Sequence, residues 1–324
     1  MKIFVTRLIP DRGINLLKEK GYEVVVNPQD WPLTKAELIA VLAEGRYDAV
    51  LCDLDHKIDA EVMDAARPSV KIFANYAVGF DNIDVKGAIE RGIAVTNTPG
   101  VLTDTVAEHT FALLLAIAHR VAEADRFTRA GKYKGWTPTL FLGTDVSKKR
   151  LGVVGLGRIG SRVAHHAARG FDMRVIYYDV KRNEEFEKEV GAEFRAEVDD
   201  IFREADFVSL HVPLSPETRQ LVDGRRLSLM KKTAYLINTS RGPVVDEKAL
   251  VAALQNGTIR GAALDVYENE PALAPGLADL ENVILTPHIA SATEETRQTM
   301  SELAAQNIIE GLEGRTPPNL VKIQ

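Results

Sequence analysis

Short β-branched runs alternate with helical patterns along the first part of the chain. The runs KIFVT, YEVVV, YDAVLCD, VKIFANY and IAVTN each have the length of a strand, and segments such as DRGINLLKEKG, TKAELIAVLAEG and VKGAIERG separate them. Strands joined by single helices form right-handed crossovers. This spacing therefore predicts a mostly parallel sheet.

The same alternation resumes at Leu151. The second series of strands reads LGVVGLG, RVIYYD, DFVSLHV, AYLINTS, GAALDV and VILTPH, with helical segments such as DEKALVAALQNG between them. A length of 324 residues suits about two domains. We therefore predict an α/β protein with two doubly wound, parallel-sheet domains of the Rossmann type. A last helix, ATEETRQTMSELAAQNIIEGLEG, follows the second series, and its return to the first domain would make that domain discontinuous.

One long helix is predicted between the two series, from Thr105 to Ala130. Its first residues, TVAE, match the capping-box pattern, and Gly131 follows as a terminator. The stretch from Phe111 to Ala118 is apolar on nearly every face, and one small domain rarely buries such a stretch alone. We expect it to be covered between domains or between two subunits.

Composition and charge exclude several kinds of partner. The net charge is −6 and no basic block is present, so neither nucleic acid nor an anionic membrane is expected. The most apolar run, VAEHTFALLLAIAH, is interrupted by charged and histidine residues and is too short to span a bilayer. Cys52 is the only cysteine, and the start of the chain lacks a signal-peptide pattern. These features predict a cytoplasmic protein.

A glycine-rich turn opens the second series. Gly155, Gly157 and Gly160 form a G-x-G-x-x-G pattern after an apolar strand and at the start of a helix, and the next strand ends in Asp179. This context is typical of dinucleotide binding. The glycines allow a tight turn, close approach of a pyrophosphate and helix–strand packing, and the helix N-terminus favours the phosphates. A methyl-donor-binding Rossmann domain remains an alternative on this pattern alone.

The residue at the end of that next strand bears on the choice of cofactor. Asp179 would accept hydrogen bonds from the ribose hydroxyls and would repel a 2′-phosphate. We therefore expect NAD, with NADH preferred to NADPH. Lys181 and Arg182 leave NADPH open, because either side chain could turn toward a phosphate.

An acid and a histidine lie close to two prolines near the end of the chain. Glu270 precedes one proline, and His288 follows another eighteen residues later. A carboxylate beside a histidine favours the imidazolium and fixes its tautomer, which suits a general acid working near neutral pH. The alternative is that both residues are loop side chains facing water.

Six phrases of the sequence resemble the D-isomer-specific 2-hydroxyacid dehydrogenases, in that family's order and across essentially the whole chain. They are YAVGFDNIDV, TVAEHT, HVPLSPETRQLV, LINTSRGPVVDEKAL, GAALDVYENEP and LTPHIASAT. The resemblance implies a discontinuous substrate-binding (catalytic) domain, residues 1–99 and 289–324, around an NAD-binding domain, residues 100–288. It also implies a homodimer built largely through the long helix.

The resemblance further implies a catalytic trio of Arg241, Glu270 and His288. The planar guanidinium of Arg241 can bind the carboxylate of a 2-oxo acid and polarise its ketone. His288 can give a proton to the ketone oxygen as hydride reaches carbon 2, while Glu270 keeps the imidazole charged and oriented. Val78 and Gly79, in AVGFD, would offer backbone N–H groups to the substrate carboxylate.

Further cofactor contacts are implied by the matching motifs. Arg158 and Ile159 lie within the glycine turn. The others are Thr105, Asp179, His211, Val212, Pro213, Thr239 and Asp265. Asp265 would hold the nicotinamide amide, although a carboxylate at a strand end can also cap a helix. The helical histidines show no ligand cluster, so no metal site is predicted and they are expected to be structural or solvent-facing. They are His109, His119, His165 and His166.

Val78 and the stretch GKYKGWTPTLFLGTD look most like the glyoxylate/hydroxypyruvate reductase branch of the family. We therefore expect NAD(P)H-dependent reduction of a small 2-oxo acid to the D-2-hydroxy acid, and the reverse oxidation. Other substrates, such as 2-ketogluconate or pyruvate, remain alternatives. A non-catalytic NAD-sensing binding protein is an alternative from a different class.

Overall fold

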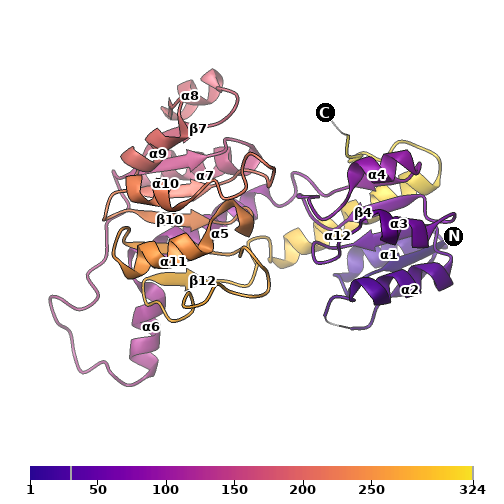
Figure 1. Cartoon of the computed structure of the whole chain (residues 1–324), viewed down its shortest axis with the longest axis horizontal. Coiled ribbons are helices and arrows are strands. Elements are labelled where there is room, and N and C mark those ends of the chain that lie inside the picture. The colour runs from indigo at the N-terminus through magenta and orange to yellow at the C-terminus, as the bar shows by residue number, and fades with distance from the viewer. Residues whose placement is uncertain (30, 323–324) are drawn as a thin grey trace. The chain divides into compact units, whose positions relative to one another are not determined.

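The computed structural model describes residues 1–29 and 31–322. It divides the chain into two compact units, which Figure 1 shows. Unit 1 comprises residues 1–102 together with the chain from Ala292 onward, and unit 2 comprises Thr103–Ser291. The divisions fall after residues 102 and 291, whereas the sequence analysis placed them after residues 99 and 288. The assignment of one unit to the cofactor and the other to the substrate stays a prediction.

Unit 1 is built on a parallel sheet. In sheet order its strands are β2 (Glu23–Val26), β1 (Lys2–Val5), β3 (Ala49–Cys52), β4 (Ile72–Asn75) and β5 (Ala94–Thr96). Its helices are α1 (Asp11–Glu19), α2 (Lys35–Gly45), α3 (Ala60–Ala66), α4 (Val85–Glu90) and α12 (Glu294–Leu312). Strands β3 and β4 are buried along their whole length, as expected where helices cover both faces of a parallel sheet.

The C-terminal helix α12 packs within unit 1, on α1 and over strands β3 and β4. Its contact with α1 depends on a glycine, because a Cβ on Gly13 would overlap the carbonyl group of Ser301. The amide of Gly13 also donates a hydrogen bond to Ser301 Oγ at 3.0 Å. The two ends of the chain therefore share one core.

Unit 2 contains a second parallel sheet. In sheet order its strands are β12 (Val283–Leu285), β11 (Gly261–Leu264), β10 (Tyr235–Asn238), β9 (Phe207–Leu210), β6 (Arg150–Val154), β7 (Arg174–Tyr178) and β8 (Glu193–Phe194). Helices α5 (Thr103–Ala118) and α7 (Arg158–Phe171) share one apolar core with this sheet. Helices α9 (Val198–Glu204), α10 (Gly224–Leu229) and α11 (Glu247–Gln255) share a second. The predicted fold class, two doubly wound parallel sheets, is confirmed.

The strand order of unit 2 changes direction between β6 and β9, because β7 and β8 lie on one side of β6 and β9 to β12 on the other. In open α/β sheets, ligands bind outside the carboxyl ends of the strands at such a switch point. The glycine-rich turn follows β6 directly, so it lies at this position.

The single long helix predicted from Thr105 to Ala130 is wrong. Helix α5 ends at Ala118, and Arg120, with φ of 56°, turns the chain into α6 (Val121–Arg129). Helix α5 also begins at Thr103, two residues before the predicted start, so Thr105 is not its N-cap. A non-glycine residue in the left-handed region is uncommon, and nothing in the hydrophobic pattern indicated one here.

The expectation that one domain could not cover the apolar stretch of α5 is also wrong. Most of the stretch is buried against α7 and the strands of unit 2 itself. The buried residues are Phe111, Leu113, Leu114, Ile117 and Ala118. Ala112 is exposed, and Leu115 and Ala116 are half-buried.

Two further findings bear on the sequence analysis. The sequence analysis placed no strand between β7 and β9, but this segment forms α8 (Glu184–Val190), the short strand β8 and α9. Across residues 1–29 and 31–322, no helix combines the length and the apolar character needed to cross a membrane.

Candidate active site

Glu270 and His288 meet beyond the carboxyl ends of β11 and β12. Glu270 Oε2 lies 2.9 Å from His288 Nδ1, and Glu270 Oε1 accepts a hydrogen bond from the amide of Tyr267 at 2.9 Å. The two paired side chains are about one-third exposed, at 32% for the histidine and 31% for the glutamate. The Nδ1 contact leaves Nε2 as the ring nitrogen that can meet a substrate.

The backbone of His288 adopts an unusual conformation. Its φ is 53°, in the left-handed region that non-glycine residues rarely occupy. The amide of His288 donates to the carbonyl oxygen of Asp265 at 2.9 Å. Such a conformation persists where neighbouring contacts enforce it, and strained residues of this kind cluster at functional sites.

A fully buried carboxylate, Asp265, holds the loop after β12. Its Oδ1 accepts hydrogen bonds from Thr286 Oγ1 at 2.6 Å and from the amide of Ile289 at 2.9 Å, and Oδ2 accepts from the amide of Ala290 at 2.8 Å. Burial alone would raise the pKa of Asp265, but the bonds from His109, Thr286 and the two amides outweigh it and lower the pKa. The group therefore remains a carboxylate that anchors the active-site loop.

His109 approaches the same carboxylate from α5, a contact that the sequence analysis missed. Its Nε2 lies 3.4 Å from Asp265 Oδ1 and 3.3 Å from Thr286 Oγ1. One signal was present in the sequence, because His109 follows Thr105 by four residues and so shares a helix face with a predicted cofactor contact. Thr286 carried no such signal.

Arg241 follows β10, the neighbour of β11, so it lies at the same edge of the sheet. Its carbonyl oxygen accepts a hydrogen bond from Asn238 Nδ2 at 3.0 Å, and its Nη1 donates to the carbonyl of Ser240 at 2.9 Å. The next residue is Gly242, where a Cβ would overlap the backbone of Tyr267. This glycine lets the Arg241 loop pack directly against the loop that carries the paired glutamate.

Glu247, at the start of α11, braces the loop around Glu270, and the sequence analysis did not single it out. Its buried carboxylate accepts hydrogen bonds from the amide of Glu268 at 2.7 Å and from that of Ala274 at 3.2 Å. Burial raises the pKa of Glu247. An acid in the first turn of a helix is common for other reasons, so the sequence carried no distinct signal.

The three glycines of the turn have different surroundings. A Cβ on Gly155, whose φ is +95°, would lie 2.8 Å from the carbonyl of His211, and a Cβ on Gly160 would overlap the carbonyl oxygen of Gly155. Around Gly157, apart from the glycine itself and its two neighbours in the chain, no atom of the described residues lies within 4 Å of such a Cβ. Packing therefore requires the first and third glycines, while the second leaves open space in front of α7.

That open space suits a phosphate. Helix α7 begins at Arg158, and its N-cap is Gly157, which has no side chain that could cap the helix. The first amides of the helix, including those of Arg158 and Ile159, therefore receive no bond from an N-cap side chain and can bind an anion. These residues fit the pyrophosphate of a dinucleotide.

Asp179 lies directly after β7 and is fixed beside the glycine turn. Its Oδ2 accepts a hydrogen bond from the amide of Leu156 at 2.6 Å, and its Oδ1 accepts from the amide of Lys181 at 3.2 Å. A carboxylate offers about four lone pairs. Asp179 can therefore still accept hydrogen bonds from ribose hydroxyls in this position.

The other predicted cofactor contacts of unit 2 follow its strands or open α5. Residues 211–213 follow β9, Thr239 follows β10, and Thr105 lies in the first turn of α5. Thr239 Oγ1 is 2.9 Å from Thr110 Oγ1. Burial of the ring lowers the pKa of His211 to about 3, although the residue as a whole keeps some exposure, so this imidazole is neutral at physiological pH.

Val78 and Gly79 belong to unit 1, where they follow β4. The carbonyl oxygen of Val78 accepts a hydrogen bond from Asn97 Nδ2 at 2.7 Å, and that of Gly79 accepts from Asn75 Nδ2 at 2.8 Å. The loop is therefore fixed by two asparagine side chains. The role of its amides toward a substrate stays a prediction.

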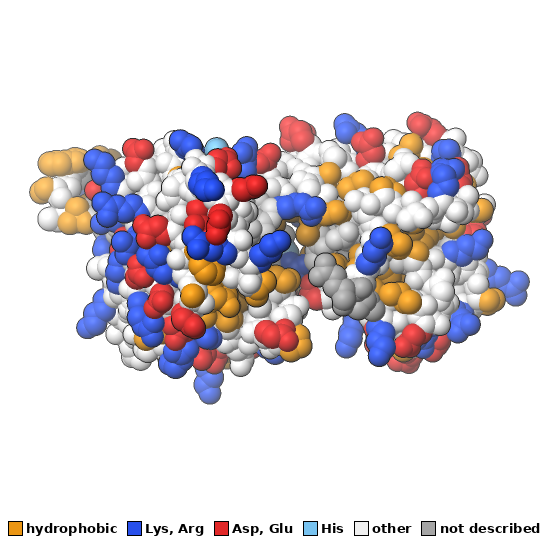
Figure 2. Space-filling view, turned by 90° about the horizontal axis from the view of Figure 1, so that it is seen from above, with side chains coloured by type: hydrophobic (Ala, Val, Ile, Leu, Met, Phe, Trp, Pro, Cys, Tyr) orange, Lys and Arg blue, Asp and Glu red, His pale blue; other side chains and the backbone are white. Residues whose placement is uncertain are grey.

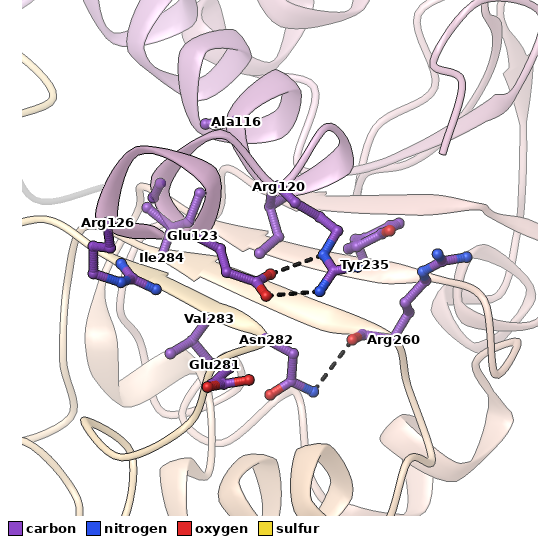
Figure 3. A pocket seen from close by; sticks show the side chains of 12 residues that line it. Ala116, Arg120, Glu123, Arg126, Tyr235, Arg260, Glu281, Asn282, Val283 and Ile284 are labelled. Atoms are coloured by element: carbon purple, nitrogen blue, oxygen red, sulfur yellow. Dashed lines mark hydrogen bonds and ion pairs between the residues drawn. The ribbon is translucent and has the colours of Figure 1, made fainter. Parts of the chain in front are cut away.

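Two hollows of unit 2 lie away from the Glu270–His288 pair. Figure 3 shows the first, a cavity of 260 Å³ beside α6, in which Arg120 pairs with Glu123 at 2.7 Å. The second is an open apolar groove between α5 and α7, lined by residues that include Phe111, Ala112 and Phe171. Among residues 1–29 and 31–322, no cluster of three or more His, Cys, Asp or Glu side chains is placed to hold a metal ion.

Comparison with known proteins identifies the family. The family model for the D-isomer specific 2-hydroxyacid dehydrogenase, NAD binding domain, matches residues 111–290. The chain is 52% identical over 324 residues to the glyoxylate reductase of Thermococcus kodakarensis, with 99% of this chain and 96% of that protein covered.

Two solved structures are similar over nearly the whole chain. A protein of Thermus thermophilus has a TM-score of 0.92 at 45% identity, with 99% of this chain and 100% of the other covered. An NADPH-dependent glyoxylate/hydroxypyruvate reductase of Sinorhizobium meliloti, solved with citrate, has a TM-score of 0.87 at 35% identity, with 99% and 97% covered. From these matches, the chain belongs to the D-isomer specific 2-hydroxyacid dehydrogenases, a family of oxidoreductases.

Proposed function

We propose that this chain reduces a small 2-oxo acid of the glyoxylate/hydroxypyruvate type to the D-2-hydroxy acid with NADH, and catalyses the reverse oxidation. The observation that carries the proposal is the contact of 2.9 Å between Glu270 and His288. This pair lies at the carboxyl edge of the same sheet that carries the glycine turn. The glyoxylate reductase of T. kodakarensis, 52% identical, supports the substrate class.

In this proposal the proton comes from His288. When bound, the nicotinamide supplies the hydride that reduces carbon 2 of the substrate. The imidazolium of His288 gives its Nε2 proton to the ketone oxygen and becomes neutral, so the product is an alcohol. Glu270, on Nδ1, stabilises the charged ring before the transfer and keeps it oriented. In the oxidation, the neutral ring accepts the proton.

Arg241 is proposed to bind the substrate. A guanidinium has a planar set of donors that matches a carboxylate, and the positive charge also polarises the neighbouring ketone. Its position after β10 places it next to the loop of Glu270, because Gly242 packs on Tyr267. Arg241 therefore belongs to the same edge of the sheet as the proposed acid.

We also propose that the chain forms a homodimer. Helix α6 has no buried residue, and residues 131–140 after it are all exposed. Trp136 is 82% exposed, and Tyr133 and Leu142 are more than half exposed. Figure 2 shows hydrophobic side chains gathered at the end of unit 2 where, as Figure 1 shows, the segment after α6 extends. A second copy of the chain would remove this apolar surface from water.

A cytoplasmic location is proposed as well. Cys52 is the only cysteine of the sequence, and its side chain is buried in β3. Burial raises the pKa of the Cys52 thiol, so the reactive thiolate is disfavoured. The protein forms no internal disulfide, which suits a reducing compartment.

The substrate class is tested by NADH consumption with glyoxylate, hydroxypyruvate, pyruvate and 2-ketogluconate. We expect the highest kcat/KM with glyoxylate or hydroxypyruvate. His288→Ala should lower the rate by about 10²–10⁴-fold, as expected for a lost general acid. NADH binding, followed by fluorescence, should survive this change, and His119→Ala, at an exposed histidine, should leave the rate unchanged. Binding of NADH without turnover of any 2-oxo acid would instead indicate an NAD-sensing protein.

The cofactor preference is tested at Asp179. We expect kcat/KM with NADH to exceed that with NADPH by about 10–100-fold, the effect of an unpaired or repelled charge at the ribose. Asp179→Ser should narrow this ratio, whereas Asp279→Ser, at an exposed acid elsewhere in unit 2, should not change it. Equal efficiencies with the two cofactors in the unmodified enzyme would rule out the preference.

The dimer is tested by sedimentation at micromolar concentration. The expected mass is about twice the 35.7 kDa of one chain. Trp136→Ser should weaken association, because it removes the most exposed large aromatic of the proposed interface. Trp31→Ser is the matched control, since Trp31 is also exposed but belongs to unit 1. A stable monomer of the unmodified protein would contradict the proposal.

A further inference from the structure

Arg182 lies in the loop that follows Asp179, the proposed ribose contact, and its guanidinium is bound by another acid. Arg182 is three residues beyond Asp179, and the bond from the Lys181 amide to Asp179 Oδ1 keeps the start of this loop beside the carboxylate. Its Nε and Nη2 donate to the two carboxylate oxygens of Glu187 at 2.9 and 2.7 Å. The guanidinium carbon is also 5.8 Å from the ring centre of Phe194.

Glu187 is itself fixed in place. The hydroxyl of Tyr177 donates to Glu187 Oε1 at 2.8 Å, and that hydroxyl accepts a bond from the amide of Asn183 at 2.8 Å. The Glu187 side chain is only 15% exposed. Hydrogen bonds from Arg182 and then Tyr177 hold the pKa of Glu187 down to about 2, so the group is charged throughout the physiological range.

Lys181 and Arg182, the two cations of this loop, would bind a phosphate in different ways. A lysine ammonium acts as a point charge on a flexible stem, whereas an arginine guanidinium binds phosphate through two parallel donors. The Nε and Nη2 donors of Arg182, the pair best suited to such a contact, are both taken by Glu187. Arg182, the residue whose guanidinium would bind a 2′-phosphate best, is therefore not available to such a phosphate.

We propose that Glu187 determines cofactor specificity by sequestering Arg182. Asp179 disfavours a 2′-phosphate through its charge, and Glu187 removes the nearby guanidinium that would compensate for it. The proposal rests on the NADH-dependent function proposed above. It assigns a role in cofactor choice to a residue of α8 that needs no contact with the cofactor.

The test measures binding of adenosine 2′,5′-bisphosphate by calorimetry, with 5′-AMP as the ligand that lacks the 2′-phosphate. Glu187→Gln retains the size of the side chain and can still accept from Tyr177, but it loses the charge that holds Arg182. We expect about tenfold tighter binding of the bisphosphate, the size of one gained charge-assisted hydrogen bond, with 5′-AMP unchanged. Glu185→Gln, an exposed acid on the same helix, is the matched control and should show no gain.

Arg182 must be responsible for that gain. The double variant Glu187→Gln/Arg182→Ala should return to the affinity of the unmodified protein, and Arg182→Ala alone should bind the bisphosphate as the unmodified protein does. The proposal is overturned if the Glu187→Gln gain is absent or persists in the double variant. It is also overturned if Arg182→Ala alone weakens binding of the bisphosphate. This second outcome can be measured even if the Glu187 variants do not fold.

These measurements use no 2-oxo acid and no turnover. A failure of the proposed reductase activity would therefore leave the outcome at Glu187 unaffected. An unmodified enzyme that favours NADPH would count against the proposed cofactor preference, and the Arg182→Ala affinity would show whether Arg182 causes it.

Discussion

A buried carboxylate at the end of β11 organises the candidate active site. Asp265 is fully buried, and its two oxygens accept hydrogen bonds from the side chain of Thr286 and the amides of Ile289 and Ala290. Its carbonyl oxygen also accepts the amide of His288. A buried charge is stable only with such a complete set of partners. The need to satisfy Asp265 therefore fixes the loop that presents the histidine, including its left-handed backbone.

The carboxylates around this loop have different environments and so different roles. Asp265 and Glu247 are buried and accept backbone amides, which makes them structural anchors for the two active-site loops. Glu270 is one-third exposed, and one of its oxygens is paired with His288. Partial exposure leaves the imidazole accessible for the proposed proton transfer, while the bond from Tyr267 keeps the carboxylate in position. Anchoring and chemistry are thus assigned to separate acids.

Much of the fold was predictable because strand and helix periods are local properties. The alternation of apolar runs predicted both parallel sheets, and the glycine spacing predicted a turn whose first and third glycines are required by packing. The break at Arg120 was not predictable, since an arginine with positive φ leaves no hydrophobic signature. The short strand β8 was missed because two residues carry too little pattern.

The parts of the site that sequence reasoning missed depend on contacts between distant segments. His109 on α5 approaches Asp265 and Thr286, which lie more than 150 residues later, and Glu247 reaches across to the loop of Glu268. Motif matching found Arg241, Glu270 and His288 because each stands in a characteristic phrase. It could not find residues whose importance lies in a hydrogen bond across the fold.

The central claim is that the negative charge of Glu270, beside Nδ1 of His288, assists transfer of the His288 proton to the ketone oxygen. The most direct test is the pH profile of kcat/KM, in both reaction directions, for the unmodified enzyme and for Glu270→Gln. Glutamine keeps the size and an acceptor for the Tyr267 amide but removes the charge beside the ring. The account predicts that the alkaline limb of the reduction profile and the acidic limb of the oxidation profile both move to lower pH. A slower enzyme with both limbs unmoved would contradict it, because Glu270 would then only position the loop.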